Sequence, residues 1–321
     1  MLAQRTCLLQ KERKNVTEPV VYLNGRLVPA SQAAVSVFDR GVRRGDAVFD
    51  TARTFRHRPY RLRQHLERLY RSLKYIRLDP GITLKEMEAN SLRVLEHNLP
   101  LLKPGEDTWI TQIVSRGGLR NPGAPTVVIL TEPVLFRSFA RFHKLGVPLI
   151  TPVIRHTPPQ SVDARVKTTS RMNLVLAELE AQERDPDALA LLLDLEGNVT
   201  EYTSGNFFMV RDGGLMTAYG HHVLGGISRD VVIELAGDLG IPCRETTITP
   251  YDVYHADEAF ITSTSKCILP VRSLNGIRIG KVIPGAVTKR LLEAWSEQVE
   301  IDIVEQALSH LSADERQALE V

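Results

Sequence analysis

The sequence predicts an α+β protein of two domains, and three observations support this prediction. The chain has 321 residues, which is about two domains at typical domain size. Hydrophobic residues make up 43% of it and charged residues 24%, an ordinary globular composition that excludes a disordered or fibrous protein. Segments typical of strands follow one another along the chain, whereas a doubly wound sheet would alternate strands with helices.

The first domain is expected over residues 18–135, after a polar N-terminal arm of residues 1–17. It begins with VVYLNGRLVPAS, which predicts two short strands around an Asn-Gly turn. The stretch SVFDRGVRRGDAVFDTARTFRHRPYRL is expected to contain extended segments, which carry Phe38, Val48, Phe49, Thr51 and Thr54. Leucines at helical spacing predict an amphipathic helix over 63–77, and a second helix is expected over 83–98. Two strands, TWITQIVS and TVVILTEPV, then flank the loop SRGGLRNPG.

A basic connector is expected over residues 136–146, followed by a second domain over 147–301. This domain has predicted strands at PLITPVIRH, ALALLLD, NFFMVRD and EAFITS. Its predicted helices are RMNLVLAELEAQ, residues 228–239 and a helix that begins within GAVTKRLLEAWSEQV. The charged tail, residues 302–321, is compatible with either a helix or a frayed end.

Charge and cysteine content exclude several classes of function. A net charge of +2 gives no support for a nucleic-acid partner, and no apolar run approaches the ~18 residues of a membrane span. The three cysteines are too scattered for a disulfide scaffold or a zinc site. The N-terminus lacks the small-residue cleavage site of a signal peptide. We therefore expect a cytoplasmic protein with no metal.

Two segments place reactive side chains beside predicted helices and strands. Lys167 stands between a short extended piece and a helix, a position usually taken by a solvated surface charge. In a cleft, desolvation and nearby cations would instead lower its pKa and leave a nucleophilic amine. Glu201 ends one predicted strand and Asn206 opens the next, which is equally compatible with a polar hairpin turn.

Two further segments are suited to bind an anion. In VLGGISRD a Gly-Gly turn leads into a helix that starts at Ile227 and Ser228, where free amides and the helix dipole attract phosphate. The strand EAFITS runs into hydroxyl residues that include Thr264 and Ser265. Taken singly, each of these segments is more typical of a structural role than of a functional one.

Taken together, the order and spacing of these segments resemble the class IV (fold-type IV) pyridoxal-phosphate enzymes. That family includes branched-chain and D-amino-acid aminotransferases, (R)-selective amine transaminases and aminodeoxychorismate lyases. The resemblance runs from VYLNGRLVP to about residue 295, with FDRGVRRGDAVFDTARTF and LRQHLERLYRSLKYI as the small-domain segments. It implies a small N-terminal α/β domain, a larger mixed C-terminal domain and, as is general in the family, a homodimer.

The resemblance also implies roles for individual residues. Lys167 matches the lysine that holds pyridoxal phosphate as a Schiff base and shuttles the substrate proton. Glu201 matches the acid that pairs with the pyridine nitrogen and keeps it protonated. The implied reaction moves an amino group from an amino acid to a 2-oxo acid by a ping-pong mechanism. Contacts with the cofactor phosphate are implied at Arg68, Ile227, Ser228 and Thr264.

Departures from the family pattern leave the amino donor open between branched-chain and D-amino acids. The run FDTAR lacks the glycine of branched-chain members, and Pro122 stands where D-amino-acid enzymes have a histidine. A lyase acting on aminodeoxychorismate, an (R)-amine transaminase and a non-catalytic binding protein remain the alternatives. Arginine binds carboxylates bidentately. The candidate substrate contacts are Phe49, Arg53, Arg116, Arg120 and Ser265.

Overall fold

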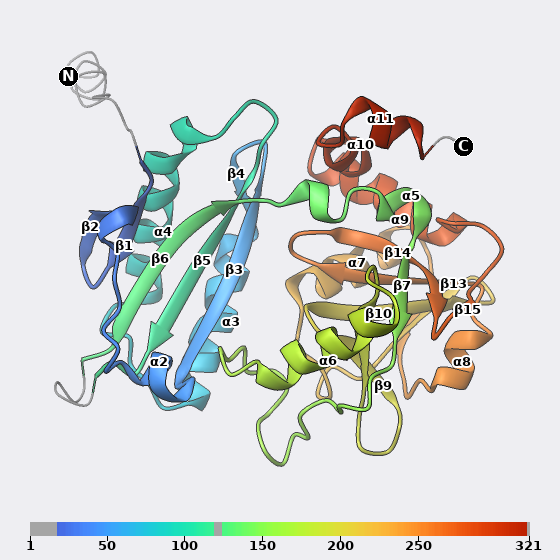
Figure 1. The fold of residues 1–321 in the computed structure, drawn as a ribbon, viewed down its shortest axis with the longest axis horizontal. Helices are drawn as coiled ribbons and strands as arrows, with labels where there is room; N and C mark the ends of the chain where they lie inside the picture. Colours follow the sequence, from blue (N-terminus) through green and yellow to red (C-terminus); the bar gives the residue numbers. More distant parts are fainter. Residues whose placement is uncertain (1–17, 119–123, 320–321) are drawn as a thin grey trace. The chain divides into compact units, whose positions relative to one another are not determined.

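The computed structural model describes residues 18–118 and 124–319. The chain divides into two compact units, the first ending at Val134 and the second beginning at Leu135 (Figure 1). The predicted arm of residues 1–17 lies outside the described residues.

The first unit is built on a six-stranded antiparallel sheet in the order β2-β1-β6-β5-β3-β4. The predicted hairpin is confirmed: Asn24 and Gly25 both have positive φ, as the favoured two-residue hairpin turn requires. The strands are β1 (Val20–Leu23), β2 (Arg26–Pro29), β3 (Ala47–Phe55), β4 (Arg58–Tyr60), β5 (Thr108–Ser115) and β6 (Thr126–Pro133).

Two helices, α3 (Leu62–Tyr75) and α4 (Leu84–Asn98), cover one face of this sheet (Figure 1). Both were predicted from the apolar spacing, and a Thr83–Glu86 capping box starts α4. A short helix, α2 (Arg40–Arg44), precedes β3, and the Asp39 side chain caps it by accepting a hydrogen bond from the Gly41 amide. Short 3₁₀ turns complete the unit at η1 (Ala30–Gln32) and η2 (Leu99–Leu101).

The second unit holds a nine-stranded mixed sheet that runs β12-β11-β10-β13-β14-β7-β8-β9, with β15 beside β14. Since β9 also pairs with β10, the strands from β10 round to β9 close into a ring. The strands are β7 (Val147–Ile150), β8 (Leu189–Leu193), β9 (Val199–Tyr202), β10 (Gly205–Arg211), β11 (Gly214–Thr217), β12 (Cys243–Glu245), β13 (Glu258–Ser263), β14 (Cys267–Leu274) and β15 (Ile277–Arg278).

Helices pack around this sheet (Figure 1). Residues 136–146, where the sequence indicated a connector, fold within the second unit as η3 and α5 and bury Phe136 and Phe142. No helix among the described residues has the length and apolarity needed to cross a bilayer. The elements are η3 (Phe136–Ser138), α5 (Phe142–Leu145), α6 (Met172–Arg184), α7 (Ile227–Asp238), α8 (Pro250–Tyr254), α9 (Ala286–Gln298), α10 (Ile303–Leu308) and α11 (Ala313–Gln317).

Candidate active site

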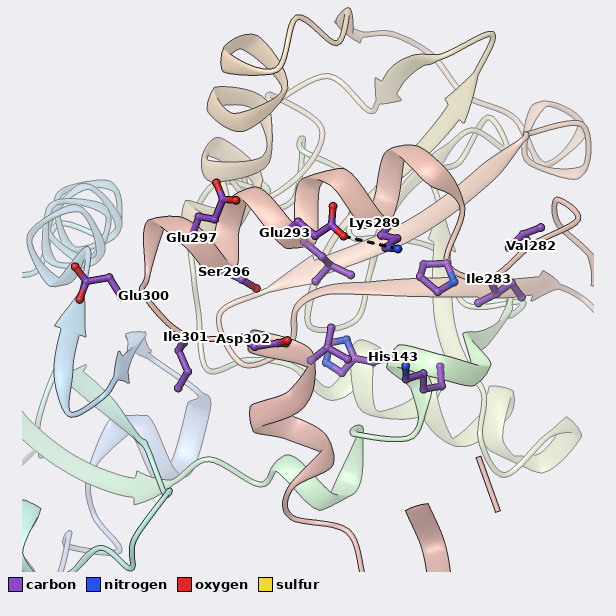
Figure 2. A pocket seen from close by; sticks show the side chains of 14 residues that line it. His143, Val282, Ile283, Lys289, Glu293, Ser296, Glu297, Glu300, Ile301 and Asp302 are labelled. Carbon is purple, nitrogen blue, oxygen red and sulfur yellow. Dashed lines mark ion pairs between the residues drawn. The ribbon is translucent and has the colours of Figure 1, made fainter. Parts of the chain in front are cut away.

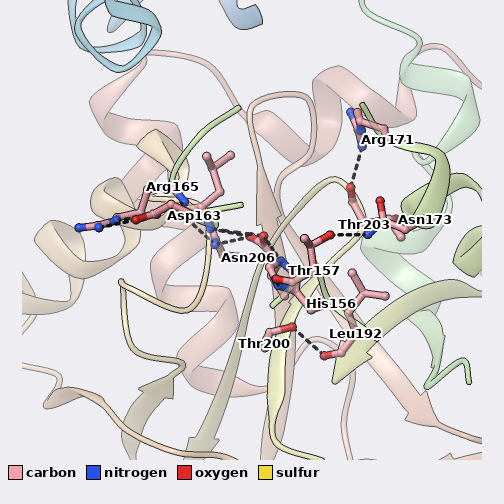
Figure 3. A network of polar contacts seen from close by, with 12 residues as sticks. His156, Thr157, Asp163, Arg165, Arg171, Asn173, Leu192, Thr200, Thr203 and Asn206 are labelled. Carbon is pink, nitrogen blue, oxygen red and sulfur yellow. Dashed lines mark hydrogen bonds and ion pairs between the residues drawn. The ribbon is translucent and has the colours of Figure 1, made fainter. Parts of the chain in front are cut away.

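Glu201 is the centre of a polar network in the second unit. Figure 3 shows two residues of this network, His156 and Asn206. Glu201 is the last residue but one of β9 and lies directly opposite Asn206 of β10, near the neighbouring strand ends that the sequence predicts. Its carboxylate accepts hydrogen bonds from His156 Nε2 at 3.1 Å, from Asn206 Nδ2 at 3.1 Å and from the Leu224 amide at 3.2 Å. The side chain is only 12% exposed, so these donors replace most of its contact with water.

The segment that carries Lys167 is anchored beside this network. Lys167 is half-buried and precedes α6. At the start of α6, Arg171 donates to the Thr203 carbonyl at 2.7 Å, and Asn173 donates to Thr157 Oγ1 at 2.9 Å. The first bond reaches the turn that follows Glu201, and the second reaches the residue after His156 (Figure 3). The chain around Lys167 is therefore tied at two points to the surroundings of Glu201.

The start of α7 meets the same network through Asn206. Gly226 is the N-cap residue and has no side chain that could cap the helix, while Ile227 and Ser228 are buried. Asn206 Nδ2 donates to the Leu224 carbonyl at 2.9 Å. A Cβ at Gly226 would stand 2.0 Å from Asn206 Oδ1, so only glycine fits here. The result is a buried helix N-terminus of the kind that binds phosphate.

The loop between β13 and β14 reaches the same end of the sheet. Thr262 of β13 pairs with Asn206 across the sheet. Thr264 and Ser265 are the first two residues after β13 ends at Ser263. The loop is tight, because Thr262 Oγ1 donates to the Cys267 carbonyl at 2.5 Å and Cys267 adopts a positive φ of 55°. Both hydroxyl residues are half-buried.

The sequence did not single out Lys266, which stands beside these hydroxyls. Its ammonium lies 5.7 Å from the centre of the Tyr202 ring and 5.8 Å from that of Phe139. Burial lowers the pKa of Lys266, and the Glu178 carboxylate only partly opposes this. In the sequence this lysine looks like any turn lysine, because nothing local shows that its side chain turns inward.

In the first unit, Arg68 is fixed by Asp50. Its Nε and Nη2 donate to the two carboxylate oxygens, both at 2.8 Å, and His65 Nδ1 lies 2.7 Å from Asp50 Oδ1. Burial alone would raise the pKa of Asp50, but Arg68 and His65 outweigh it and hold that pKa well below its usual range. The side chain of Arg68 is 5% exposed. Its contact with a phosphate stays a prediction.

Arg53 is enclosed within the first unit. Its guanidinium lies 4.0 Å from the centre of the Phe55 ring, and Nε donates to the Thr54 carbonyl at 3.0 Å. Asp107 is 3.8 Å away, and the Arg53 side chain is 2% exposed. This setting favours a structural role, and contact with substrate stays a prediction.

The other substrate candidates of the first unit differ in their surroundings. Arg116 donates to Asp46 at 3.0 Å and to the Ile76 carbonyl at 2.6 Å, so it holds the end of α3 in place. Phe49 is half-buried in β3, and Arg120 lies outside the described residues. Substrate contacts of these three residues also stay predictions.

A separate groove of about 840 Å³ lies in the second unit between α5, α9 and the start of α10 (Figure 2). Its walls include His143, Glu293 and Asp302, and none of the predicted site residues. No group of metal-ligating side chains occurs within the described parts of the chain.

The second unit has the groups that pyridoxal phosphate requires. The cofactor needs an amine for its reactive carbon, a carboxylate for its ring nitrogen and an anion site for its phosphate. The candidate amine is Lys167, and the candidate carboxylate is Glu201, which has three hydrogen-bond partners around it. The glycine-capped start of α7 provides the anion site.

Comparison with known proteins agrees with this chemistry. Residues 47–274 match the family model described as amino-transferase class IV. A Methanocaldococcus jannaschii protein, provisionally named a branched-chain-amino-acid aminotransferase, is 36% identical, with 86% of this chain and 95% of that protein covered. D-alanine aminotransferase of Bacillus licheniformis is 29% identical, with 87% of this chain and 96% of that protein covered.

A solved structure shows the same fold. The branched-chain amino acid aminotransferase of T.th., complexed with N-(5'-phosphopyridoxyl)-L-glutamate, matches with a TM-score of 0.79 and 30% identity. The match covers 89% of this chain and 95% of that one. The predicted family, the two-domain fold-type IV architecture and the cofactor are thereby confirmed. The chain belongs to the class IV aminotransferases, the pyridoxal-phosphate-dependent transaminases of fold-type IV.

Proposed function

We propose that this enzyme transfers the amino group of a branched-chain amino acid to a 2-oxo acid. The observation that carries the proposal is the nearly buried Glu201 carboxylate, which shares one end of the sheet with the Lys167 segment and the start of α7. The branched-chain donor is supported by the printed names of the relatives, among them an aminotransferase of Salmonella typhimurium at 30% identity.

Two residues handle the protons of the reaction in this proposal. Bound pyridoxal phosphate supplies an electron sink for the pair left behind when the substrate α-carbon loses its proton. Glu201 would accept the N–H of the pyridine ring, and its contacts with His156, Asn206 and Leu224 hold its carboxylate in place for that task. Lys167 would hold the cofactor covalently and, as a free amine, would take the proton from the substrate α-carbon and return it.

The candidate phosphate contacts are those that the sequence indicates. The amides of Ile227 and Ser228 and the Ser228 hydroxyl receive it at the start of α7, and Thr264 adds a hydroxyl. Arg68 supplies a guanidinium whose orientation Asp50 fixes. Ser265, Phe49, Arg53, Arg116 and Arg120 remain the candidates for substrate contact. We also propose a homodimer, which light scattering on the purified protein tests directly.

A donor screen tests the function. The cofactor-loaded enzyme is given L-leucine, D-alanine or an (R)-amine, with pyruvate or 2-oxoglutarate as acceptor, and amino-acid products are measured. We expect L-leucine to be the best donor, Lys167→Ala to abolish turnover and the visible cofactor band, and Lys289→Ala, which alters an exposed lysine of α9, to change neither.

Other outcomes of the screen would contradict the proposal. Preference for D-alanine would transfer the assignment to D-amino acids. Turnover of an amine without a carboxylate would indicate an (R)-amine transaminase. Pyruvate release from aminodeoxychorismate without any acceptor would indicate a lyase. A protein that stays colourless with added cofactor would indicate a non-catalytic binding protein.

A further inference from the structure

The hydrogen bonds of His156 indicate the charge of its imidazole ring. Its Nε2 lies 3.1 Å from Glu201 Oε1, and its Nδ1 lies 3.1 Å from the Thr157 carbonyl oxygen. A carbonyl oxygen can only accept, so Nδ1 must carry a hydrogen. Neutral imidazole has a single N–H, and therefore Nε2 can bond Glu201 only if His156 is an imidazolium or Glu201 is protonated.

The remaining contacts of Glu201 decide between these two states. Asn206 Nδ2 and the Leu224 amide both donate to it. Donors of this kind stabilise a carboxylate over the protonated acid, so the extra proton belongs on His156.

The charges around the ring agree. Burial would lower the pKa of His156, but its hydrogen bond to Glu201 and the charges of Glu201 on β9 and of Asp194 beyond β8 outweigh that effect and raise it. Glu201 and Asp194 are the charged groups that act on the ring, and both favour the imidazolium.

We propose that His156 is a positioning residue that, as an imidazolium, holds Glu201 ionised and oriented toward the pyridine nitrogen of the cofactor. This inference rests on the role proposed above for Glu201. The positive charge behind the carboxylate makes Glu201 a weaker proton acceptor. The proton shared between Glu201 and the pyridine ring consequently stays on the ring nitrogen, where it is needed for electron withdrawal.

The charge of His156 is tested first, on the full-length protein without cofactor. Histidine-ring ¹⁵N NMR is recorded from pH 5 to pH 9 for the wild type and for Glu201→Gln, with His156→Gln to assign the signal. We expect the wild-type ring to be doubly protonated at pH 7, and its titration midpoint to fall in Glu201→Gln. A singly protonated ring at pH 7, or a midpoint that Glu201→Gln leaves unchanged, overturns the inference.

The effect on the cofactor is tested by its visible spectrum as a function of pH. His156→Leu removes both the charge and the donor that face Glu201, so a new spectral transition is expected as the pH falls toward 5. His156→Gln keeps a hydrogen-bond donor but not the charge. Its transition is expected at a lower pH than that of His156→Leu. His255→Gln, which alters an exposed histidine of the turn after α8, is the matched control and should keep the wild-type spectrum.

The two sets of results separate this inference from the proposed function. A His156→Leu spectrum identical to that of the wild type at every pH overturns the positioning role. Failure of the wild type itself to bind cofactor, with the NMR titration as expected, would overturn the proposed function and leave the His156–Glu201 ion pair standing.

Discussion

Replacing Asp50 by alanine would leave the Arg68 guanidinium buried without its carboxylate. Arg68 makes two charge-assisted hydrogen bonds to Asp50, each 2.8 Å long, and its side chain is only 5% exposed. Removing one partner of such a pair costs about 3–5 kcal/mol. Two charged hydrogen bonds of about 1.5–3 kcal/mol each give about 3–6 kcal/mol, which includes that range.

Thermal unfolding followed by calorimetry measures this loss. At about 2–4 °C per kcal/mol, Asp50→Ala should lower Tm by about 6–20 °C. Arg63→Ala is the matched control, since Arg63 lies on the same helix α3 and its ion pairs with Glu67 and Glu88 are exposed. This control should change Tm very little.

Two further measurements sharpen the test. The double variant Asp50→Leu with Arg68→Met replaces the ion pair by apolar side chains and should recover most of the lost stability. The pKa of Asp50 is held low, so its contribution is present above the ordinary carboxyl pKa and is lost only as the pH falls through the lower folded value. The Tm difference should therefore be constant from pH 5 to pH 8. A Tm fall no larger than that of Arg63→Ala would refute the reasoning.

Two other substitutions test the second unit. Gly226→Ala would place a Cβ 2.0 Å from Asn206 Oδ1 and should weaken cofactor affinity by roughly tenfold, about 1.4 kcal/mol, in an absorbance titration. Gly225→Ala, where a Cβ meets nothing within 4 Å, should leave that affinity unchanged, and equal losses in both variants would contradict the clash. Lys266→Met should raise Tm at pH 7, because burial disfavours the ammonium in the folded state. That gain should shrink as the pH approaches the ordinary lysine value of about 10.4, and a gain that grew with pH would contradict the argument.

Local signals in the sequence predicted much of this structure. The predicted strand EAFITS coincides with β13, and the predicted β1–β2 hairpin follows from one Asn-Gly pair. Glu201 and Asn206 were placed at neighbouring strand ends because a short hairpin leaves few alternatives. For such elements the decisive interactions lie within a few residues of one another.

Contacts between distant segments were not predictable in this way. Asp50 and Arg68 belong to a strand and to a helix, and neither residue has a local pattern that shows the other as its partner. The inward turn of Lys266 depends on Phe139, which is far away in the sequence. His156 was missed for the same reason, because its partner Glu201 follows only after a complete helix and strand.

Asn206 fixes the distance between Glu201 and the start of α7. Its side-chain amide contacts Glu201, which we propose pairs with the ring nitrogen, and the Leu224–Gly226 segment, which leads into the proposed phosphate site. A substitution that displaces α7, for instance at the buried Val231 or Val232, would therefore move both ends together. On the proposed roles, a substitution that weakens phosphate binding at α7 would also alter the contact between Glu201 and the ring nitrogen. Changes of donor preference are better sought at Ser265, a candidate substrate contact on the loop after β13.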